Sequence, residues 1–406
     1  MRKIKQYTIW LCFLFVFISY LKAQELQFYL PDFSLKKKIL MGDEQIDQYF
    51  SLLSGKTVAV VANQTSIIGN THLVDTLISL KINIKKIFAP EHGFRGDADA
   101  GEHIDNGIDA KTGLQIISLY GKHNKPTVTD LKDIDLVVFD IQDVGARFYT
   151  YLSTMHYVME ACAENNVAFL ILDRPNPNGF YVDGPVMEKK YTSFVGMHPV
   201  PIVYGMTMAE YARMINAEGW LKNKNQCNLQ WISCKNYTHL DCYQLPIKPS
   251  PNLPNANSIY LYPSLCLFEG TVISVGRGTD HPFEMYGSPS LQNMNYKFTP
   301  KSIEGLSKHP MYENDLCFGK FLGDYGQSFI RDQRHIQLCW LIDAYKNSSE
   351  KNKFFNGFFN QLAGNSTLKE QIIKGKTEDQ IRESWQKDLI KFKNIRKKYL
   401  LYQDFE

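Results

Sequence analysis

Residues 87–96 read Ile87-Phe88-Ala89-Pro90-Glu91-His92-Gly93-Phe94-Arg95-Gly96, and the rest of the chain is organised around them. An apolar run over residues 82–88 predicts a β-strand that ends at a proline. A carboxylic acid, an imidazole and two glycines follow at once. Because ligands of an α/β sheet bind at the carboxyl ends of its strands, the stretch predicts a ligand site. The alternative is an ordinary glycine-rich surface turn.

Four similar apolar runs predict further strands, at residues 57–62, 115–119, 136–140 and 167–172. Such continuous runs indicate strands buried on both faces, as in a parallel sheet. Helical patterns at residues 72–80 and 149–165 alternate with them. This alternation predicts an α/β fold with a doubly wound, mostly parallel sheet.

Other local signals predict further elements. A helix is expected near residues 42–53, and a short one is expected after Thr129. Capping boxes at Thr207–Glu210 and Thr377–Gln380 predict two more helix starts, and residues 229–233 alternate like a strand. Four prolines within residues 246–254 exclude regular structure there and indicate a domain boundary or an extended segment that lines a cleft.

Polar side chains follow each of the five predicted strands. In a doubly wound sheet these ends face one crevice, so we expect a shared site. No glycine-rich GxGxxG turn follows the first strand, which argues against a dinucleotide cofactor, and we predict none. The polar residues at the strand ends are Asn63, Gln64, Glu91, His92, Tyr120, Asp140, Asp143, Asp173, Arg174 and Asn176.

The N-terminus resembles an export signal. Basic residues at positions 2, 3 and 5 precede an apolar run, and residues 21–23 form an acceptable cleavage site. We therefore predict a signal peptide at residues 1–23 and a secreted or periplasmic protein with no membrane span after cleavage, with a retained N-terminal anchor as the alternative. Cleavage removes four of the 45 basic residues and none of the 42 acidic ones, so no charge excess favours nucleic acid.

Seven of the eight cysteines lie beyond the predicted signal peptide. An odd number cannot all pair. Cys227, Cys234 and Cys242 are close enough in sequence for one bridge, and buried free thiols are expected for most others. No CxxC motif is present, which argues against a structural zinc site.

Carboxylic acids dominate the candidate catalytic residues, whereas no GxSxG nucleophile motif occurs. Paired acids suit glycoside hydrolysis, in which one acid protonates the leaving oxygen and the other activates water or stabilises the sugar cation. Glu91 is our first candidate. Glu269 is the second, because it follows an apolar run that can raise the pKa of a carboxyl group.

Two further acids, Asp140 and Asp143, lie at the end of the fourth strand, although Asp143 and Arg147 are also spaced to pair on a helix. Arg277 and Asp280, between glycines, are candidates to bind a substrate carboxylate and hydroxyl, or form a turn salt bridge. His92, His103 and His281 could join Asp140 and Asp143 in a metal site, but their spacing matches no metal motif, so we predict no metal.

Several long motifs, in order, resemble the exo-β-N-acetylmuramidase family, long described only as a domain of unknown function. The resemblance covers nearly all of the chain from about residue 57 onward. One departure is His281-Pro282-Phe283-Glu284, where a polar or small residue is expected before the proline. The motifs are Asn63-Gln64-Thr65, residues 90–96, residues 139–151, residues 173–177, residues 249–252, residues 262–271 and Gly276-Arg277-Gly278-Thr279.

The resemblance implies an enzyme that releases N-acetylmuramic acid from the non-reducing ends of peptidoglycan fragments. It also implies a Rossmann-like N-terminal domain, which we place at residues 24–255, and a smaller α+β domain at residues 256–406, with the active cleft between them. The alternatives are a non-catalytic wall-binding protein and a metal-dependent wall hydrolase. The substrate's lactyl carboxylate suits an arginine, with candidates Arg95, Arg147, Arg174 and Arg277. Aromatic candidates to stack on the sugar are Phe94, Tyr120, Phe148, Tyr149 and Tyr151.

Overall fold

The structure is a computed structural model that describes residues 37–95 and 106–406. Leu40–Glu406 form one compact unit, which holds all the described helices and strands. The predicted signal peptide, residues 1–23, lies outside the described residues. Within the described part of the chain, no helix is long and apolar enough to cross a bilayer.

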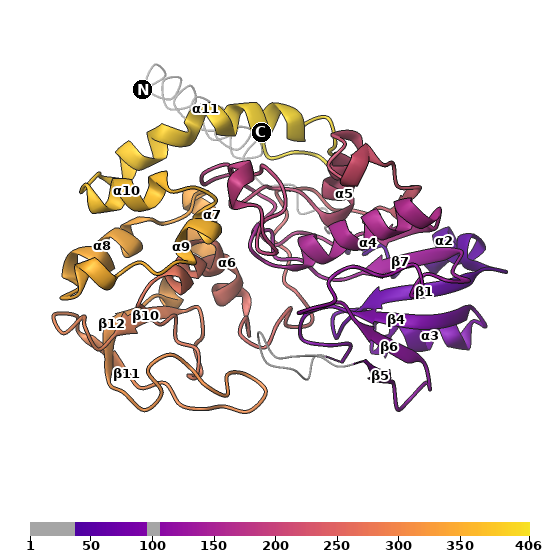
Figure 1. Ribbon diagram of the computed structural model, residues 1–406, viewed down its shortest axis with the longest axis horizontal. Coiled ribbons are helices and arrows are strands. Elements are labelled where there is room, and N and C mark those ends of the chain that lie inside the picture. The colour runs from indigo at the N-terminus through magenta and orange to yellow at the C-terminus, as the bar shows by residue number, and fades with distance from the viewer. Residues whose placement is uncertain (1–36, 96–105) are drawn as a thin grey trace, which may run out of the picture. The chain divides into compact units, whose positions relative to one another are not determined.

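A seven-stranded sheet forms the N-terminal part, with the strand order β5-β6-β4-β1-β7-β8-β9 (Figure 1). Neighbouring strands run parallel, except that β5 is antiparallel to β6. The mostly parallel sheet confirms the predicted fold class. The strands are β1 (Thr57–Ala62), β4 (Asn83–Ala89), β5 (Gly107–Ile108), β6 (Gln115–Ser118), β7 (Leu136–Asp140), β8 (Ala168–Leu172) and β9 (Leu229–Ile232).

Helices cover both faces of this sheet. Side chains alternate between the two faces along each strand, so a fully apolar strand places apolar side chains on both faces, and each face needs a cover. In β1, Val58 and Val60 join a core with helices α2 and α3, whereas Ala59 and Val61 join a core with α4 and α5. The fully apolar runs of the sequence reflect this double burial. The helices are α2 (Ile46–Leu53), α3 (Leu73–Ser79), α4 (Tyr151–Asn165) and α5 (Met208–Ala217).

The C-terminal part has a three-stranded antiparallel sheet in the order β10-β12-β11. The larger hydrophobic core includes Phe139 of the large sheet together with Leu267 and Trp385 of the C-terminal part. The N-terminal and C-terminal parts therefore share one core. The predicted boundary after residue 255 falls where Asn255 caps α6. The elements are α6 (Ala256–Leu265), β10 (Met285–Ser288), β11 (Tyr296–Phe298), β12 (Cys317–Phe321), α7 (Gln327–Gln333), α8 (Cys339–Asn347), α9 (Phe359–Ala363), α10 (Thr367–Ile373) and α11 (Glu378–Arg396).

Small elements complete the chain. A hairpin of β2 and β3 precedes α3, and short 3₁₀ helices occur in the connections. Both predicted capping boxes are present, at Thr207 and Thr377. The bounds of the small elements are β2 (Ile67–Ile68), β3 (Thr71–His72), η1 (Lys189–Tyr191), η2 (Lys222–Lys224), η3 (Cys266–Gly270), η4 (Gly323–Tyr325) and η5 (Lys351–Lys353).

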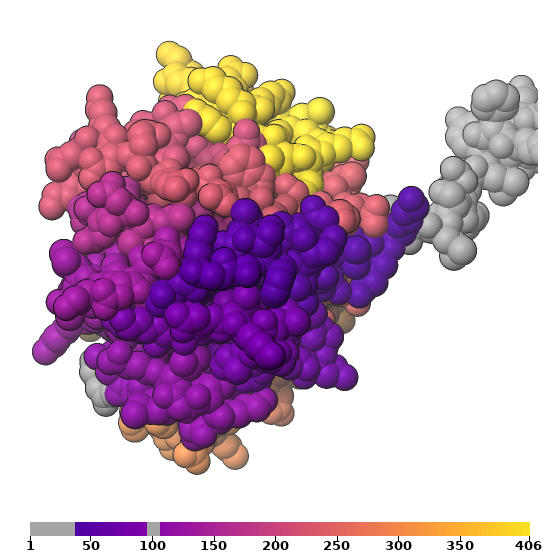
Figure 2. All heavy atoms as spheres, turned by 90° about the vertical axis from the view of Figure 1, so that its right-hand side faces the viewer, coloured from indigo at the N-terminus to yellow at the C-terminus, as the bar shows by residue number. Residues whose placement is uncertain are grey.

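The C-terminal tail returns to the N-terminal part (Figure 2), where the yellow tail covers the segments around residues 210–250. Arg396 is fully buried: its Nε donates to the carbonyl of Gly205 at 2.8 Å, and its two terminal nitrogens bind the carboxylate of Asp404 at 2.8 Å. The backbone N–H of Leu401 donates to the carboxylate of Glu210 at 2.8 Å. These contacts fasten the two parts of the unit together.

Two local predictions are wrong. Residues 128–133 form turns, not the helix expected after Thr129. The hydroxyl and N–H of Thr127 both donate to the carboxylate of Asp130, and such side-chain bonds compete with a helix. The seven cysteines from Cys162 to Cys339 are free thiols, so the possible bridge among Cys227, Cys234 and Cys242 is not formed.

Candidate active site

A cavity of about 620 Å³ lies between the carboxyl end of the large sheet and the C-terminal part. Its size falls in the usual range for small-ligand sites. Glu91 and Glu269, which are distant in sequence, both line it. The lining residues are Glu91, His92, Tyr120, Phe148, Tyr149, Thr150, Phe194, Val195, Ser250, Asn252, Leu253, Tyr262, Glu269, Arg277, Phe283, Leu306, Ser307, Lys308, His309 and Phe358.

Glu91 reaches the cavity because β4 ends in a sharp turn. Pro90 cannot continue the strand ladder. His92 and Gly93 then adopt left-handed backbone conformations, with φ of 70° and 79°, and the N–H of Gly93 donates to the carbonyl of Pro90 at 3.0 Å. A left-handed histidine is uncommon and costs free energy, which the surrounding packing has to offset. The turn therefore sets the acid at the tip of the strand.

Hydroxyl groups hold the carboxylate of Glu91. The hydroxyl of Thr150, the residue that precedes α4, donates to Glu91 Oε2 at 2.6 Å instead of capping its own helix. Burial, together with the charge and hydrogen bonding of Glu91, raises the pKa of Tyr120. The hydroxyl of Tyr151 contacts the backbone carbonyl of Glu91 at 3.4 Å. Glu91 thus lies beside the N-terminal end of α4, where the helix dipole favours a negative charge.

The second acid of the cavity, Glu269, is paired with Arg277. Both Nε and Nη2 of Arg277 contact Glu269 Oε1, at 2.8 and 2.7 Å. The other carboxylate oxygen accepts from the thiol of Cys266 at 3.5 Å. Burial favours a lower pKa for Arg277, but the charge of Glu269 outweighs it and raises the pKa. The pair lies on the C-terminal side of the cavity.

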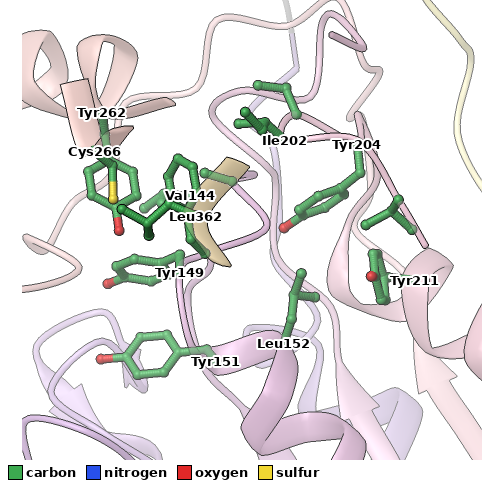
Figure 3. Close-up of a cluster of buried hydrophobic side chains, with 14 of the residues drawn as sticks. Val144, Tyr149, Tyr151, Leu152, Ile202, Tyr204, Tyr211, Tyr262, Cys266 and Leu362 are labelled. Atoms are coloured by element: carbon green, nitrogen blue, oxygen red, sulfur yellow. The ribbon is translucent and has the colours of Figure 1, made fainter. Parts of the chain in front are cut away.

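Aromatic rings connect the two acids. Tyr149 lies between the rings of Tyr151 and Tyr262, with centroid distances of 4.8 and 5.9 Å (Figure 3). The ring of Tyr262 contacts Phe283 at 5.0 Å, and the guanidinium of Arg277 lies 5.1 Å from the centroid of Phe283. Aromatic faces of this kind suit the apolar faces of sugar rings.

The proline-rich segment forms part of the cavity wall, as the sequence analysis expected of an extended segment. Ser250, Asn252 and Leu253 line the cavity. The hydroxyl of Tyr149 donates to the carbonyl of Pro249 at 2.8 Å, and the side-chain amide of Gln64 donates to the same carbonyl at 3.1 Å. Gln64 therefore supports the wall from outside the cavity.

Two predicted catalytic acids, Asp140 and Asp143, lie in the protein interior and not among the residues that line the cavity. Asp140 is fully buried and pairs with Arg174, which also contacts Asp43 at 2.6 Å. Asp143 accepts from the hydroxyl of Tyr204 and from the N–H of Gly145. Acids enclosed in this way have no access to a substrate, so we assign both to structural support.

Other predicted binding residues also lie inside the protein. Arg147 is 2% exposed, and its guanidinium donates to three backbone carbonyls. Asp173 accepts from Thr207, Ala209 and Tyr402, and burial raises its pKa to about 6 despite these hydrogen bonds. Asn176 and Asn63 are buried and hydrogen-bonded. These residues shape the loops behind the cavity.

Two more predicted binding residues, Arg95 and Asp280, do not line the main cavity. Arg95 pairs with Asp109 at 2.9 Å and lines a separate cavity of about 290 Å³ with Asp75. Asp280 is exposed and does not line the main cavity, although its neighbour Arg277 does. Of the possible metal ligands, His103 lies outside the described residues. Among the residues described, no group of three or more His, Cys, Asp or Glu side chains is placed to hold a metal ion.

The sequence analysis missed several lining residues. Thr150 belongs to one of the quoted motifs, but nothing in its position shows that its hydroxyl turns to Glu91. Phe194 and Val195 come from a long loop, and residues 306–309 come from another, with no periodic signal in either. Tyr262 and Phe283 offered a recognisable clue, because Tyr262 opens the quoted motif at residues 262–271 and Phe283 lies in the quoted stretch at residues 281–284.

Comparisons with known proteins identify the family of the chain. Residues 58–257 match the family described as exo-beta-N-acetylmuramidase NamZ, N-terminal, and residues 260–402 match its C-terminal counterpart. The peptidoglycan beta-N-acetylmuramidase NamZ of Bacillus subtilis (strain 168) is 37% identical over 398 residues, which cover 90% of this chain and 92% of that protein.

Two crystal structures of DUF1343 family proteins from Bacteroides fragilis NCTC 9343 have the same fold. One is 48% identical with a TM-score of 0.84, and covers 91% of this chain and all of its own. The other is 30% identical with a TM-score of 0.72, and covers 90% of this chain and 99% of its own. Since the family matches span both parts of the structure, the chain belongs to the exo-β-N-acetylmuramidase NamZ family.

Proposed function

We propose that the protein is an exo-acting glycoside hydrolase that releases N-acetylmuramic acid from the non-reducing ends of peptidoglycan fragments, and so serves cell-wall turnover. One structural observation carries this proposal: Glu91 lines a cavity of saccharide size, and its carboxyl group accepts a hydrogen bond from the hydroxyl of Thr150 at 2.6 Å. The related protein of Bacillus subtilis is named a peptidoglycan beta-N-acetylmuramidase, and the description of the matching family adds that the enzyme is exo-acting.

Glu91 is the proton donor in this proposal. Cleavage of a glycosidic bond needs an acid that protonates the leaving oxygen while positive charge develops on the sugar ring. Thr150 fixes one carboxyl oxygen of Glu91 at 2.6 Å, which orients the group without neutralising it. The aromatic residues Tyr149, Tyr262 and Phe283 line the cavity beside the two acids. The muramyl saccharide is thereby held with its terminal linkage near the acid.

Glu269 was predicted from the sequence as the second catalytic acid, but its contacts favour a different role. Its carboxylate is engaged by two nitrogens of Arg277, so it holds that arginine in place. We therefore assign proton transfer to Glu91 and treat Glu269 as a positioning residue. Both acids line the same cavity, so the arginine that Glu269 positions lies in the cavity that Glu91 lines.

The test compares Glu91→Gln with wild type on two substrates. On a muramyl disaccharide, whose leaving sugar needs protonation, the variant should lose about 10²- to 10⁴-fold in kcat. On a nitrophenyl muramide, whose leaving group departs without a proton, the loss should be much smaller. The control is Glu383→Gln, on the exposed face of α11, which should behave as wild type.

Equal rates for Glu91→Gln and wild type on the disaccharide would remove Glu91 as the acid. A wild-type protein that binds muramyl saccharides without turnover would instead be a wall-binding protein. Activity that persists after exhaustive chelation excludes the metal-dependent alternative.

We also propose that the protein acts outside the cytoplasm, as a secreted or periplasmic enzyme. The signal peptide predicted at residues 1–23 and the extracytoplasmic location of peptidoglycan support this. N-terminal sequencing of the protein from its native compartment should begin at Gln24. A protein that retains residues 1–23 would contradict cleavage.

A further inference from the structure

Arg277 is the one arginine of the four sequence candidates that lines the main cavity. Arg147 and Arg174 are 2% and 3% exposed, and they donate hydrogen bonds to carbonyls or carboxylates of the protein itself. Arg95 is paired with Asp109 at a separate cavity. An anionic group of a bound saccharide therefore meets Arg277 and none of the other three.

The loop around Arg277 fixes its backbone. Gly276 and Gly278 both have φ of 78°, in the left-handed region that favours glycine. A Cβ on Gly278 would lie 2.5 Å from the carbonyl oxygen of Lys301, and one on Gly276 would lie 2.7 Å from the side chain of Met285. The flanking glycines are thus required by the close packing, and the arginine between them is held in a defined place.

The guanidinium group of Arg277 retains hydrogen-bonding capacity. It has two forked edges, each able to bind a carboxylate. Glu269 occupies the Nε–Nη2 edge through its single oxygen Oε1. Within residues 37–95 and 106–406, Nη1 makes no hydrogen bond. The side chain of Arg277 is 26% exposed, so this end of the group is open to a ligand.

We propose that Arg277 binds the lactyl carboxylate of the terminal muramic acid through the Nη1 end that Glu269 leaves open, and so distinguishes muramic acid from N-acetylglucosamine. The inference rests on the proposed function and names the residue behind its sugar specificity. The two sugars differ only in the lactyl ether, whose carboxylate matches the planar fork of an arginine. Glu269 keeps the fork in position from the opposite edge.

The experiment measures binding of two free sugars by calorimetry: N-acetylmuramic acid and its lactyl amide, which differ in one negative charge. Wild type should prefer the acid by about 10- to 100-fold, as expected for a charge-assisted pair. In Arg277→Gln this preference should disappear, so that the acid and the amide bind with about equal affinity. Arg334→Gln removes the same charge from an exposed position outside the cavity and should keep the wild-type preference.

Two further variants keep the test decisive. Arg277→Gln leaves Glu269 without its cation, so the double variant Arg277→Gln/Glu269→Gln restores a neutral hydrogen-bonded pair; it should lose the preference to the same extent. Lys308→Gln removes another cation that lines the cavity. Loss of the preference in Lys308→Gln, with retention in both Arg277 variants, would overturn the proposal.

Binding and turnover separate the two proposals. Should wild type prefer the acid over the amide but fail to cleave any muramide, the hydrolase function would be wrong while the Arg277 subsite stands. Should wild type cleave muramides while Arg277→Gln retains the full preference, the subsite would be wrong and the hydrolase function would stand.

Discussion

Strands β4 and β7, which lie on either side of β1 in the large sheet, each lead to a carboxylic acid, and the fold gives these two acids opposite surroundings. At the end of β4, Glu91 lines the cavity and is held by the hydroxyl of Thr150. At the end of β7, Asp140 is fully buried and contacts Arg174 through both carboxylate oxygens, at 2.6 and 3.0 Å. In the sequence, both acids simply follow an apolar strand.

The difference comes from what covers each strand end. The loop after β8 carries Arg174 over the end of β7, and the segment before α2 adds Asp43 to the same guanidinium at 2.6 Å. The turn after β4 instead opens toward the cavity. The cation Arg174 holds Asp140 in the interior, whereas a neutral hydroxyl holds one carboxylate oxygen of the half-buried Glu91, which reaches the cavity. The surroundings, not the position on the strand, therefore separate a structural acid from a catalytic one.

The largest effect should come from Asp140→Asn. It leaves Arg174 in the interior with one carboxylate partner fewer, and breaking a buried ion pair costs about 3–5 kcal/mol. We expect the free energy of unfolding, measured by denaturant titration, to fall by that amount. Asp388→Asn, which breaks an exposed pair with Lys391 on α11, is the control and should leave stability unchanged. A loss in Asp140→Asn no larger than in the control would show that the buried pair is not structural.

The next effect concerns the hydroxyl groups around Glu91. Thr150→Val removes the donor at 2.6 Å and keeps the shape of the side chain. Since a hydrogen bond to a charged group contributes about 1.5–3 kcal/mol, kcat/KM on a muramyl disaccharide should fall about 10- to 100-fold. Tyr345→Phe removes a hydroxyl that lies away from the cavity and should leave kcat/KM unchanged. Wild-type kcat/KM in Thr150→Val would mean that this hydroxyl does not orient the acid.

These contrasts show how far the sequence could predict the site. The apolar runs located β1 and β7, which are buried on both faces, and β4, which is fully buried only over its last three residues, Ile87 to Ala89. The run before Glu91 also placed that acid at a strand end. Arg174 and Asp43 are 131 residues apart, and no local pattern reveals that they meet at Asp140. The same limit hid the pairing of Glu269 with Arg277, because charge partners are set by tertiary packing.

A smaller effect should appear in the pH dependence of stability. Burial raises the pKa of Asp143 to about 6, although hydrogen bonds from Tyr204 and Gly145 lower it in part. Because the folded-state pKa lies above the unfolded value of 3.8, the stabilising contribution is present at low pH and is lost as pH rises through about 6. Lowering the pH from 7 to 5 should therefore stabilise wild type relative to Asp143→Asn by about 1 kcal/mol. A difference between the two proteins that stays constant over this range would contradict the buried, protonated state of Asp143.

The smallest effect, and the sharpest contrast with Asp140, should be the stability of Glu91→Gln. Glutamine keeps the size of the side chain and an oxygen that accepts from the hydroxyl of Thr150. The free energy of unfolding should therefore change by no more than about 0.5 kcal/mol, as is usual where no buried network is broken. The variant would then separate activity from stability, since its turnover of a disaccharide should fall by orders of magnitude while its fold persists. A destabilisation of several kcal/mol, comparable to that of Asp140→Asn, would instead place Glu91 among the structural acids, and the distinction between the two strand ends would be lost.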